Sequence, residues 1–121
     1  MSSPSRGTLY VDSSALVKLI VREDETDALQ AELSPWPLLA TSSIAVIEVR
    51  RAVRRARADG RPDILPDAEI DELLDVPIEM VLTDQVRRAA AALDPGELRT
   101  LDAIHVAGAL ALGDDLAALV T

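Results

Sequence analysis

The sequence predicts an α/β fold, a three-layer α/β/α domain around a mostly parallel central sheet. Short runs of strand-forming apolar residues alternate with longer amphipathic patterns, and this order is typical of strand–helix–strand units. The chain has 121 residues, of which 49% are hydrophobic, so it has the size of one domain and can bury a sizeable core. We therefore expect residues 1–121 to form a single domain, with residues 1–7 as a flexible amino end.

The expected elements are delimited by apolar runs, capping residues and helix breakers. Ser13 and Ser14 follow the first apolar run and can cap a helix, as Thr83 can cap a later one. Gly60 is placed to end the longest helix. The expected strands cover residues 9–11, 38–41, 78–82 and 116–121. The expected helices cover residues 15–21, 23–33, 44–58, 63–75, 83–93 and 99–112.

Composition excludes several classes of site. The chain has no cysteine and one histidine, His105, so thiolate and histidine-rich zinc sites are excluded. A protein-bound metal would rest mainly on carboxylates, which favour hard cations such as Mg²⁺ or Mn²⁺. The sequence shows no secretory signal and no apolar run of membrane-spanning length, so we expect a cytoplasmic protein without membrane contact.

Three carboxylates stand in apolar surroundings. Asp12 comes directly after the first expected strand, Glu48 lies among apolar helical neighbours, and Asp102 lies near a helix start. Each has a simpler interpretation: Asp12 as a helix N-cap, Glu48 as an ion-pair partner of Arg51, and Asp102 as an ordinary first-turn residue.

The positions of these acids favour a shared role. All three lie near strand-to-helix junctions, which gather at one end of a parallel sheet. Carboxylates gathered there repel one another unless a cation neutralises them. A bound divalent ion would also activate water and stabilise charge on a phosphoryl group, so hydrolysis of phosphodiesters is the expected chemistry.

At these residues the sequence resembles the PIN-domain ribonucleases, specifically the VapC-type toxins of bacterial toxin–antitoxin pairs. The opening motif matches residues 10–16 (YVDSSAL), the internal glutamate matches residues 42–49 (SSIAVIEV), and the late motif matches residues 98–107 (LRTLDAIHVA). The last match is the most specific. The resemblance extends from about Thr8 to Thr121.

The resemblance implies a PIN fold and an Mg²⁺- or Mn²⁺-dependent endoribonuclease that acts as the toxin of a type II system. It implies a cognate antitoxin and a homodimer as partners. By resemblance, Asp12, Glu48 and Asp102 would bind the metal and act in catalysis, and Ser14 or Thr100 would position water or substrate.

The family usually carries a further aspartate after the last strand, a position that the sequence does not match. Asp114 and Asp115 precede that strand, and the sequence stops at Thr121. We therefore expect either that a carboxyl-terminal segment is missing or that the protein lacks this fourth ligand.

One expected helix is dense in arginine, although the formal net charge of the chain is −9. Arg50 and Arg54 begin a series at helical spacing next to Glu48, and arginine forks suit phosphate. We expect them to contact RNA; a surface for an acidic antitoxin segment and a solvated face are the alternatives. His105 is expected in the core or behind the metal ligands.

Two other functions fit parts of the pattern. A catalytically weak or inactive PIN scaffold would act only through antitoxin or partner binding. A signalling receiver domain also clusters acids around Mg²⁺, but it needs a lysine after a late strand, and the single lysine is Lys18.

Overall fold

A computed structural model describes residues 7–121, so the expected flexible amino end falls outside the described residues except for Gly7. Its four strands form one wholly parallel sheet in the order β3-β2-β1-β4. The strands are β1 (Thr8–Val11), β2 (Leu38–Ser42), β3 (Ile78–Met80) and β4 (Leu116–Val120). The helices are α1 (Ser13–Ile20), α2 (Thr26–Leu33), α3 (Ala45–Ala58), α4 (Asp67–Leu74), α5 (Asp84–Ala92), α6 (Thr100–Leu110) and the 3₁₀ turn η1 (Gly113–Asp115).

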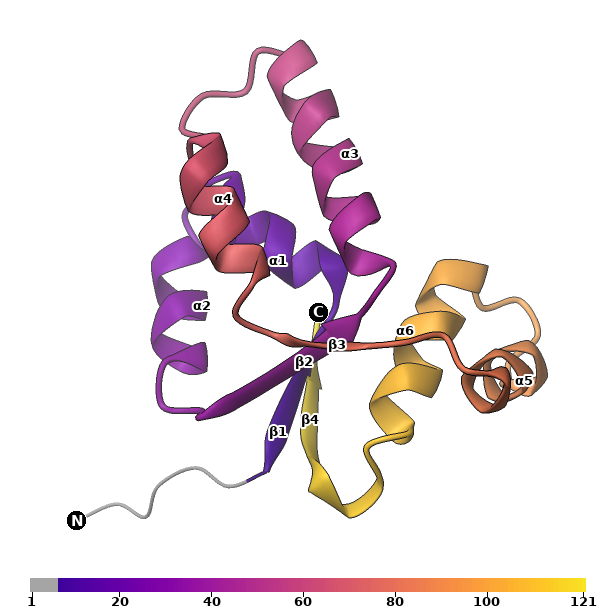
Figure 1. The fold of residues 1–121 in the computed structure, drawn as a ribbon. Coiled ribbons are helices and arrows are strands. Elements are labelled where there is room, and N and C mark those ends of the chain that lie inside the picture. Colours follow the sequence, from indigo (N-terminus) through magenta and orange to yellow (C-terminus); the bar gives the residue numbers. More distant parts are fainter. Residues whose placement is uncertain (1–6) are drawn as a thin grey trace.

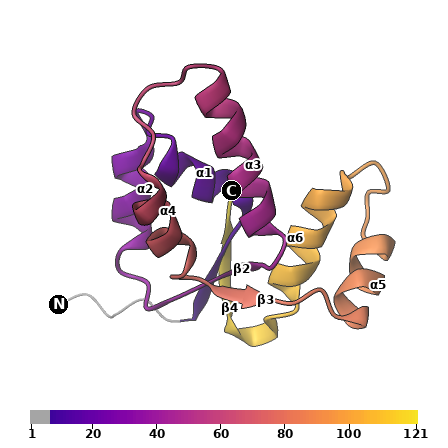
Figure 2. The same ribbon diagram turned by 45° about the horizontal axis from the view of Figure 1, so that its top comes forward.

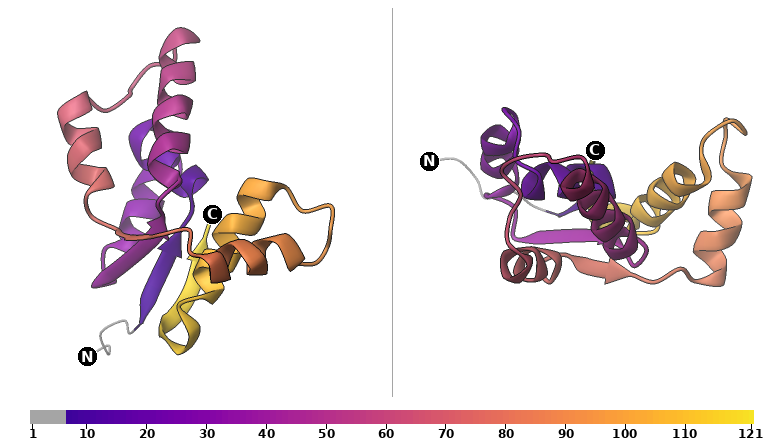
Figure 3. Two further views of the ribbon diagram at one scale, coloured as in Figure 1. Left: turned by 45° about the vertical axis from the view of Figure 1, so that its right-hand side comes forward. Right: turned by 90° about the horizontal axis from the view of Figure 1, so that it is seen from above.

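Helices cover both faces of the sheet, which confirms the expected three-layer α/β/α fold (Figure 1). One core joins β1 to side chains of α1, α2, α3 and α4. The second, smaller core lies between the sheet and α6. Figure 2 shows α5 and α6 apart from the first four helices, and Figure 3 shows the same separation from above.

The side chains of β1 alternate between the two cores. Leu9 and Val11 belong to the core under α1 and α3, whereas Tyr10 belongs to the core under α6. Successive side chains of a strand point to opposite faces, so this alternation follows from strand geometry. Because β1 is central and buried on both faces, it forms a fixed platform for the residues that follow it.

Two element boundaries in particular differ from the expected ones. The helix expected from residue 23 begins at Thr26, whose hydroxyl accepts a hydrogen bond from the Glu23 N–H. The third strand ends at Met80 because its partner strand ends at the paired residue Ser42. Among residues 7–121, no helix is long and apolar enough to cross a membrane.

Helix α3 ends where the sequence predicts, in a glycine-dependent turn. The Gly60 N–H donates to the Arg57 carbonyl, and the Arg61 N–H donates to the Ala56 carbonyl. Gly60 has a φ of 71°, so this pair of bonds is a Schellman motif with glycine in the left-handed region. The motif sets the length of the helix that carries Glu48.

Replacing Gly60 by alanine is expected to lower the free energy of unfolding by about 1 kcal/mol, because an L side chain is strained at this φ. Urea denaturation measures the loss. Gly96→Ala is the control, since a methyl group meets no atom within 4 Å at either glycine and Gly96 has no positive φ. Equal losses in the two variants would contradict a backbone origin.

Candidate functional site

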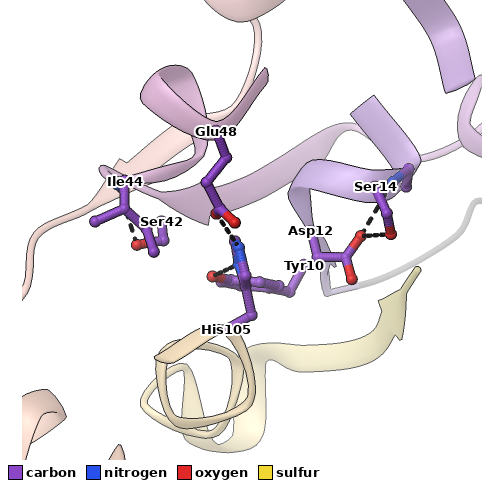
Figure 4. A network of polar contacts seen from close by, with 8 residues as sticks. Tyr10, Asp12, Ser14, Ser42, Ile44, Glu48 and His105 are labelled. Atoms are coloured by element: carbon purple, nitrogen blue, oxygen red, sulfur yellow. Dashed lines mark hydrogen bonds and ion pairs between the residues drawn. The ribbon is translucent and has the colours of Figure 1, made fainter. Parts of the chain in front are cut away.

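The candidate site lies at the edge of the sheet where the parallel strands end. Asp12 directly follows β1, and Ser42 is the last residue of β2. Glu48 is in the first turn of α3, and His105 comes from α6 on the other side of the sheet. Figure 4 shows these side chains together. Ligands of open α/β sheets bind at this edge, and Asp12 and Glu48 lie there.

Asp12 is the N-cap of α1, a role that the sequence analysis weighed as its simpler alternative. Its Oδ1 accepts hydrogen bonds from the Ala15 N–H at 3.0 Å and from the Ser14 hydroxyl at 2.7 Å. The residue is only 9% exposed. The prediction that Ser13 and Ser14 cap this helix is therefore wrong, because Asp12 comes first and holds Ser14 as its donor. The cap fixes the carboxylate at the end of β1.

A chain of hydrogen bonds joins β1, α6 and α3. The Tyr10 hydroxyl lies 2.8 Å from Nδ1 of His105, and Nε2 of His105 lies 2.7 Å from Oε1 of Glu48. Glu48 thus pairs with His105. The simpler alternative, an ion pair of Glu48 with Arg51, is wrong. The expectation that His105 lies in the core is confirmed, since its side chain is buried. It also contacts Glu48.

The packing around Tyr10 explains why the hydrogen bond between Tyr10 and His105 is short and buried. The Tyr10 ring is fully buried and meets the His105 ring edge-on, with centroids 5.7 Å apart. A Cβ at Gly108 would lie 3.2 Å from the Tyr10 hydroxyl oxygen, so a glycine in α6 leaves room for the ring. Sequence reasoning missed Tyr10 as a site residue. Its position two residues before Asp12, hence on the same side of an extended chain, was an available signal.

The protonation state of the Tyr10 phenol follows from its environment. Burial raises the pKa of the Tyr10 phenol well above its ordinary value of 10.0, and the Asp12 carboxylate adds to the rise. Hydrogen bonding to Ser42 lowers this pKa, and the Glu48 carboxylate raises it. The phenol therefore keeps its proton. A neutral His105 satisfies both bonds when Tyr10 donates to Nδ1 and the Nε2–H donates to Glu48.

Asp102 and Thr100 both lie in the first turn of α6 and are exposed. Asp102 is near a helix start, as the sequence predicts, but the interpretation that its surroundings are apolar is wrong. Ala103 beside it turns into the protein, and Asp102 turns outward. His105, which contacts Glu48, is three residues after Asp102 on α6. Asp102 therefore lies about one helical turn from His105.

Four exposed arginines of α3 fall into two groups. Two of them pair with acidic residues of α4, Arg50 with Asp71 at 2.7 Å and Arg57 with Asp67 at 2.8 Å. Arg54 lines a cavity of about 300 Å³ together with Arg50 and Arg57. Arg55 instead lines a cavity that also contains Glu48 and Ser14. The first group thus faces α4 and the second faces the candidate site.

The chemistry of the donors suits a hard divalent cation. The Asp12 and Glu48 carboxylates are both close enough to Tyr10 to raise its pKa, which puts two oxygen donors at one edge of the sheet. Mg²⁺ is commonly held by one or two carboxylates and several waters. In residues 7–121, no group of three or more His, Cys, Asp or Glu side chains is arranged to hold a metal ion. The structure therefore brings two of the three predicted ligands together and leaves Asp102 outside that pair.

Comparison with known proteins identifies the class of this fold and site. A family model described as PIN domain matches residues 9–119. The chain therefore belongs to the PIN-domain family, as its motifs predict.

Characterised relatives narrow the class to the VapC type. The chain is 43% identical over 117 residues to Ribonuclease VapC46 of Mycobacterium tuberculosis strain H37Rv. It is 38% identical over 123 residues to Ribonuclease VapC35 of that strain, and 35% identical over 117 residues to Ribonuclease VapC47 of strain CDC 1551. Each alignment covers 93% of this chain and 82% of the relative.

Tyr10 is the single tyrosine, so its titration can be followed by tyrosinate absorbance. Its folded pKa is raised, so near pH 10 and above, the unfolded state releases a proton that the folded state keeps. Stability from this group is complete below about pH 10 and falls as the pH rises further. In buffer with EDTA, tyrosinate absorbance should therefore appear together with loss of the helical circular dichroism signal.

Tyr10→Phe is the companion variant, because it keeps the ring and removes the ionisable group. We expect its free energy of unfolding to fall less steeply than that of the wild type above pH 10. Tyrosinate absorbance that rises near pH 10 while the helical signal persists would contradict a buried, hydrogen-bonded phenol.

Proposed function

We propose that this protein is an Mg²⁺- or Mn²⁺-dependent endoribonuclease, the toxin component of a type II toxin–antitoxin system. Membership of the PIN-domain family and similarity to proteins named Ribonuclease VapC support the nuclease class. The observation that carries the proposal is the placement of Asp12 and Glu48 around Tyr10 at the carboxyl edge of the sheet. A divalent ion held there would supply an activated water and stabilise charge on the phosphodiester.

In this proposal Asp12, Glu48 and Asp102 hold the metal ion. Two of them are already oriented: the α1 amino end and the Ser14 hydroxyl hold Asp12, and His105 holds Glu48. Asp102 is exposed on the first turn of α6 and would complete the set by side-chain rotation when RNA and metal bind. Ser14 and Thr100, both exposed, would position water or substrate.

We propose RNA backbone contacts for Arg50 and Arg54, which line a cavity between α3 and α4. Both guanidinium groups are exposed, and arginine is well suited to phosphate. The ion pair of Arg50 with Asp71 means that RNA would have to compete with a carboxylate for that side chain. Arg54 has no recorded ion pair among residues 7–121, so we expect the larger contribution from Arg54.

The proposed partners are RNA, a cognate antitoxin and a second copy of the chain. Exposed apolar side chains support a protein partner: Leu38, Val76 and Ile78 are each about half exposed or more and line a cavity of about 350 Å³. Contiguous apolar surface of this kind is typical of interaction sites.

We propose action in the cytoplasm. Sedimentation equilibrium tests the homodimer, which predicts twice the mass of one chain.

A second candidate function is a catalytically weak or inactive PIN scaffold that acts through antitoxin or partner binding. The exposed position of Asp102 favours it, since residues 7–121 present no ready group of three metal donors. The two functions differ in whether metal binding and RNA cleavage depend on the acidic residues.

We expect Mn²⁺ to raise the melting temperature of the wild type and not of Asp12→Asn. Asparagine is as good an N-cap as aspartate, so the variant keeps the start of α1 and loses the charge. Asp114→Asn is the control, because it removes an exposed carboxylate at the opposite edge of the sheet. An equal Mn²⁺ response in Asp12→Asn and the wild type would remove Asp12 from the metal site.

Asp102→Asn tests the reaction itself. We expect cleavage of total RNA after induction of the wild type, mapped by sequencing of new ends, and a loss of at least about 100-fold in the variant. Because Asp102 is exposed, the change should leave the melting temperature of the metal-free protein unaltered. Cleavage by Asp102→Asn at the wild-type rate would contradict its role, and a wild type without cleavage would favour the scaffold.

A further inference from the structure

We infer that Lys18 and Arg55 form a subsite for a phosphate group of the RNA backbone, next to the candidate site. The inference rests on the proposed function, since it supplies the substrate position that the acidic residues alone lack. It concerns Lys18 of α1 and Arg55 of α3, which the structure brings to one cavity from different helices.

Both residues line one cavity with the candidate site. The cavity has a volume of about 380 Å³ and lies between α1 and α3, which pack against each other. Ser14 and Glu48 form part of its wall, and Lys18 and Arg55 form another part. The remaining lining residues are Ser13, Val17, Glu23 and Ala52. A ligand in this cavity would contact the site hydroxyl and carboxylate together with two cations.

Helical spacing explains why the cations and the site residues share a wall. Lys18 is four residues after Ser14 on α1, so the two lie one turn apart on the same face. Arg55 is seven residues after Glu48 on α3, which is two turns along the same face, about 10 Å by the rise of an α-helix. Lys18 and Arg55 thus lie farther along both helices than Ser14 and Glu48. A neighbouring phosphate of a bound RNA strand would lie at these two cations.

The two cations in this cavity differ from other arginines of α3. Arg50 and Arg57 are paired with carboxylates of α4. Within the described part of the chain, no ion pair is recorded for Lys18 or Arg55. Glu23 also lines the cavity, and its carboxylate lies 3.3 Å from the Arg61 guanidinium.

Phosphate is the ligand class that these two cations suit. A guanidinium fork binds phosphate oxygens in pairs, and a lysine ammonium adds a point charge. The chain carries a formal net charge of −9, so RNA is repelled over most of the surface. Two unpaired cations beside Glu48 would offset that repulsion at the place where the strand must enter.

The test is salt-dependent binding of a labelled, unstructured single-stranded RNA oligonucleotide, measured by fluorescence anisotropy in EDTA. For Lys18→Gln/Arg55→Gln we expect weaker binding. The slope of log K against log salt should flatten by about 1.4, because each lost contact to a single strand is worth about 0.7. With Mn²⁺ present, KM for RNA cleavage should rise while kcat is retained.

The matched control is Arg87→Gln/Arg88→Gln, which removes two exposed cations from α5 on the other side of the sheet. Its salt slope should equal that of the wild type. The subsite would be overturned by a salt slope that is unchanged in the Lys18/Arg55 variant, or by one that flattens equally in both variants. In either case, RNA cleavage by the wild type would leave the proposed function standing. A wild type that neither binds nor cleaves RNA would overturn both.

Discussion

The hydrogen-bonded chain from Tyr10 through His105 to Glu48 is the interaction on which the site depends. It connects three elements that are distant in sequence: a central strand, the last long helix and the arginine-rich helix. Buried polar groups of this kind must be satisfied, because an unpaired donor or acceptor away from water costs about 1–3 kcal/mol. Each member of the chain therefore constrains the others, and Glu48 is held at a fixed place relative to the end of β1.

The same arrangement explains the division of labour among the acidic residues. Asp12 is held by a helix amino end and Glu48 by an imidazole, so both are oriented before any ligand arrives. Asp102 is on the first turn of α6, one turn before His105, and is exposed. Two oriented carboxylates match the one or two carboxylates by which proteins commonly hold Mg²⁺ together with water.

The arginines of α3 differ in their partners. Arg50 and Arg57 pair with acidic side chains of α4. Arg55, on the face that carries Glu48, lines the cavity beside the site. One helix thus carries both arginines paired with α4 and an arginine that lines a cavity with Glu48.

The sequence by itself determined the fold class, the parallel sheet and the edge at which Asp12 and Glu48 lie, because these follow from local periodicity and from short connections. It also determined the place of Asp12, since a residue directly after a central strand has little freedom. Only the tertiary structure decided that Glu48 pairs with His105 and not Arg51, that Asp102 turns outward, and that Arg55 and Lys18 share a cavity. These outcomes depend on which helices meet across the sheet and at what rotation, and a helical pattern read alone fixes neither.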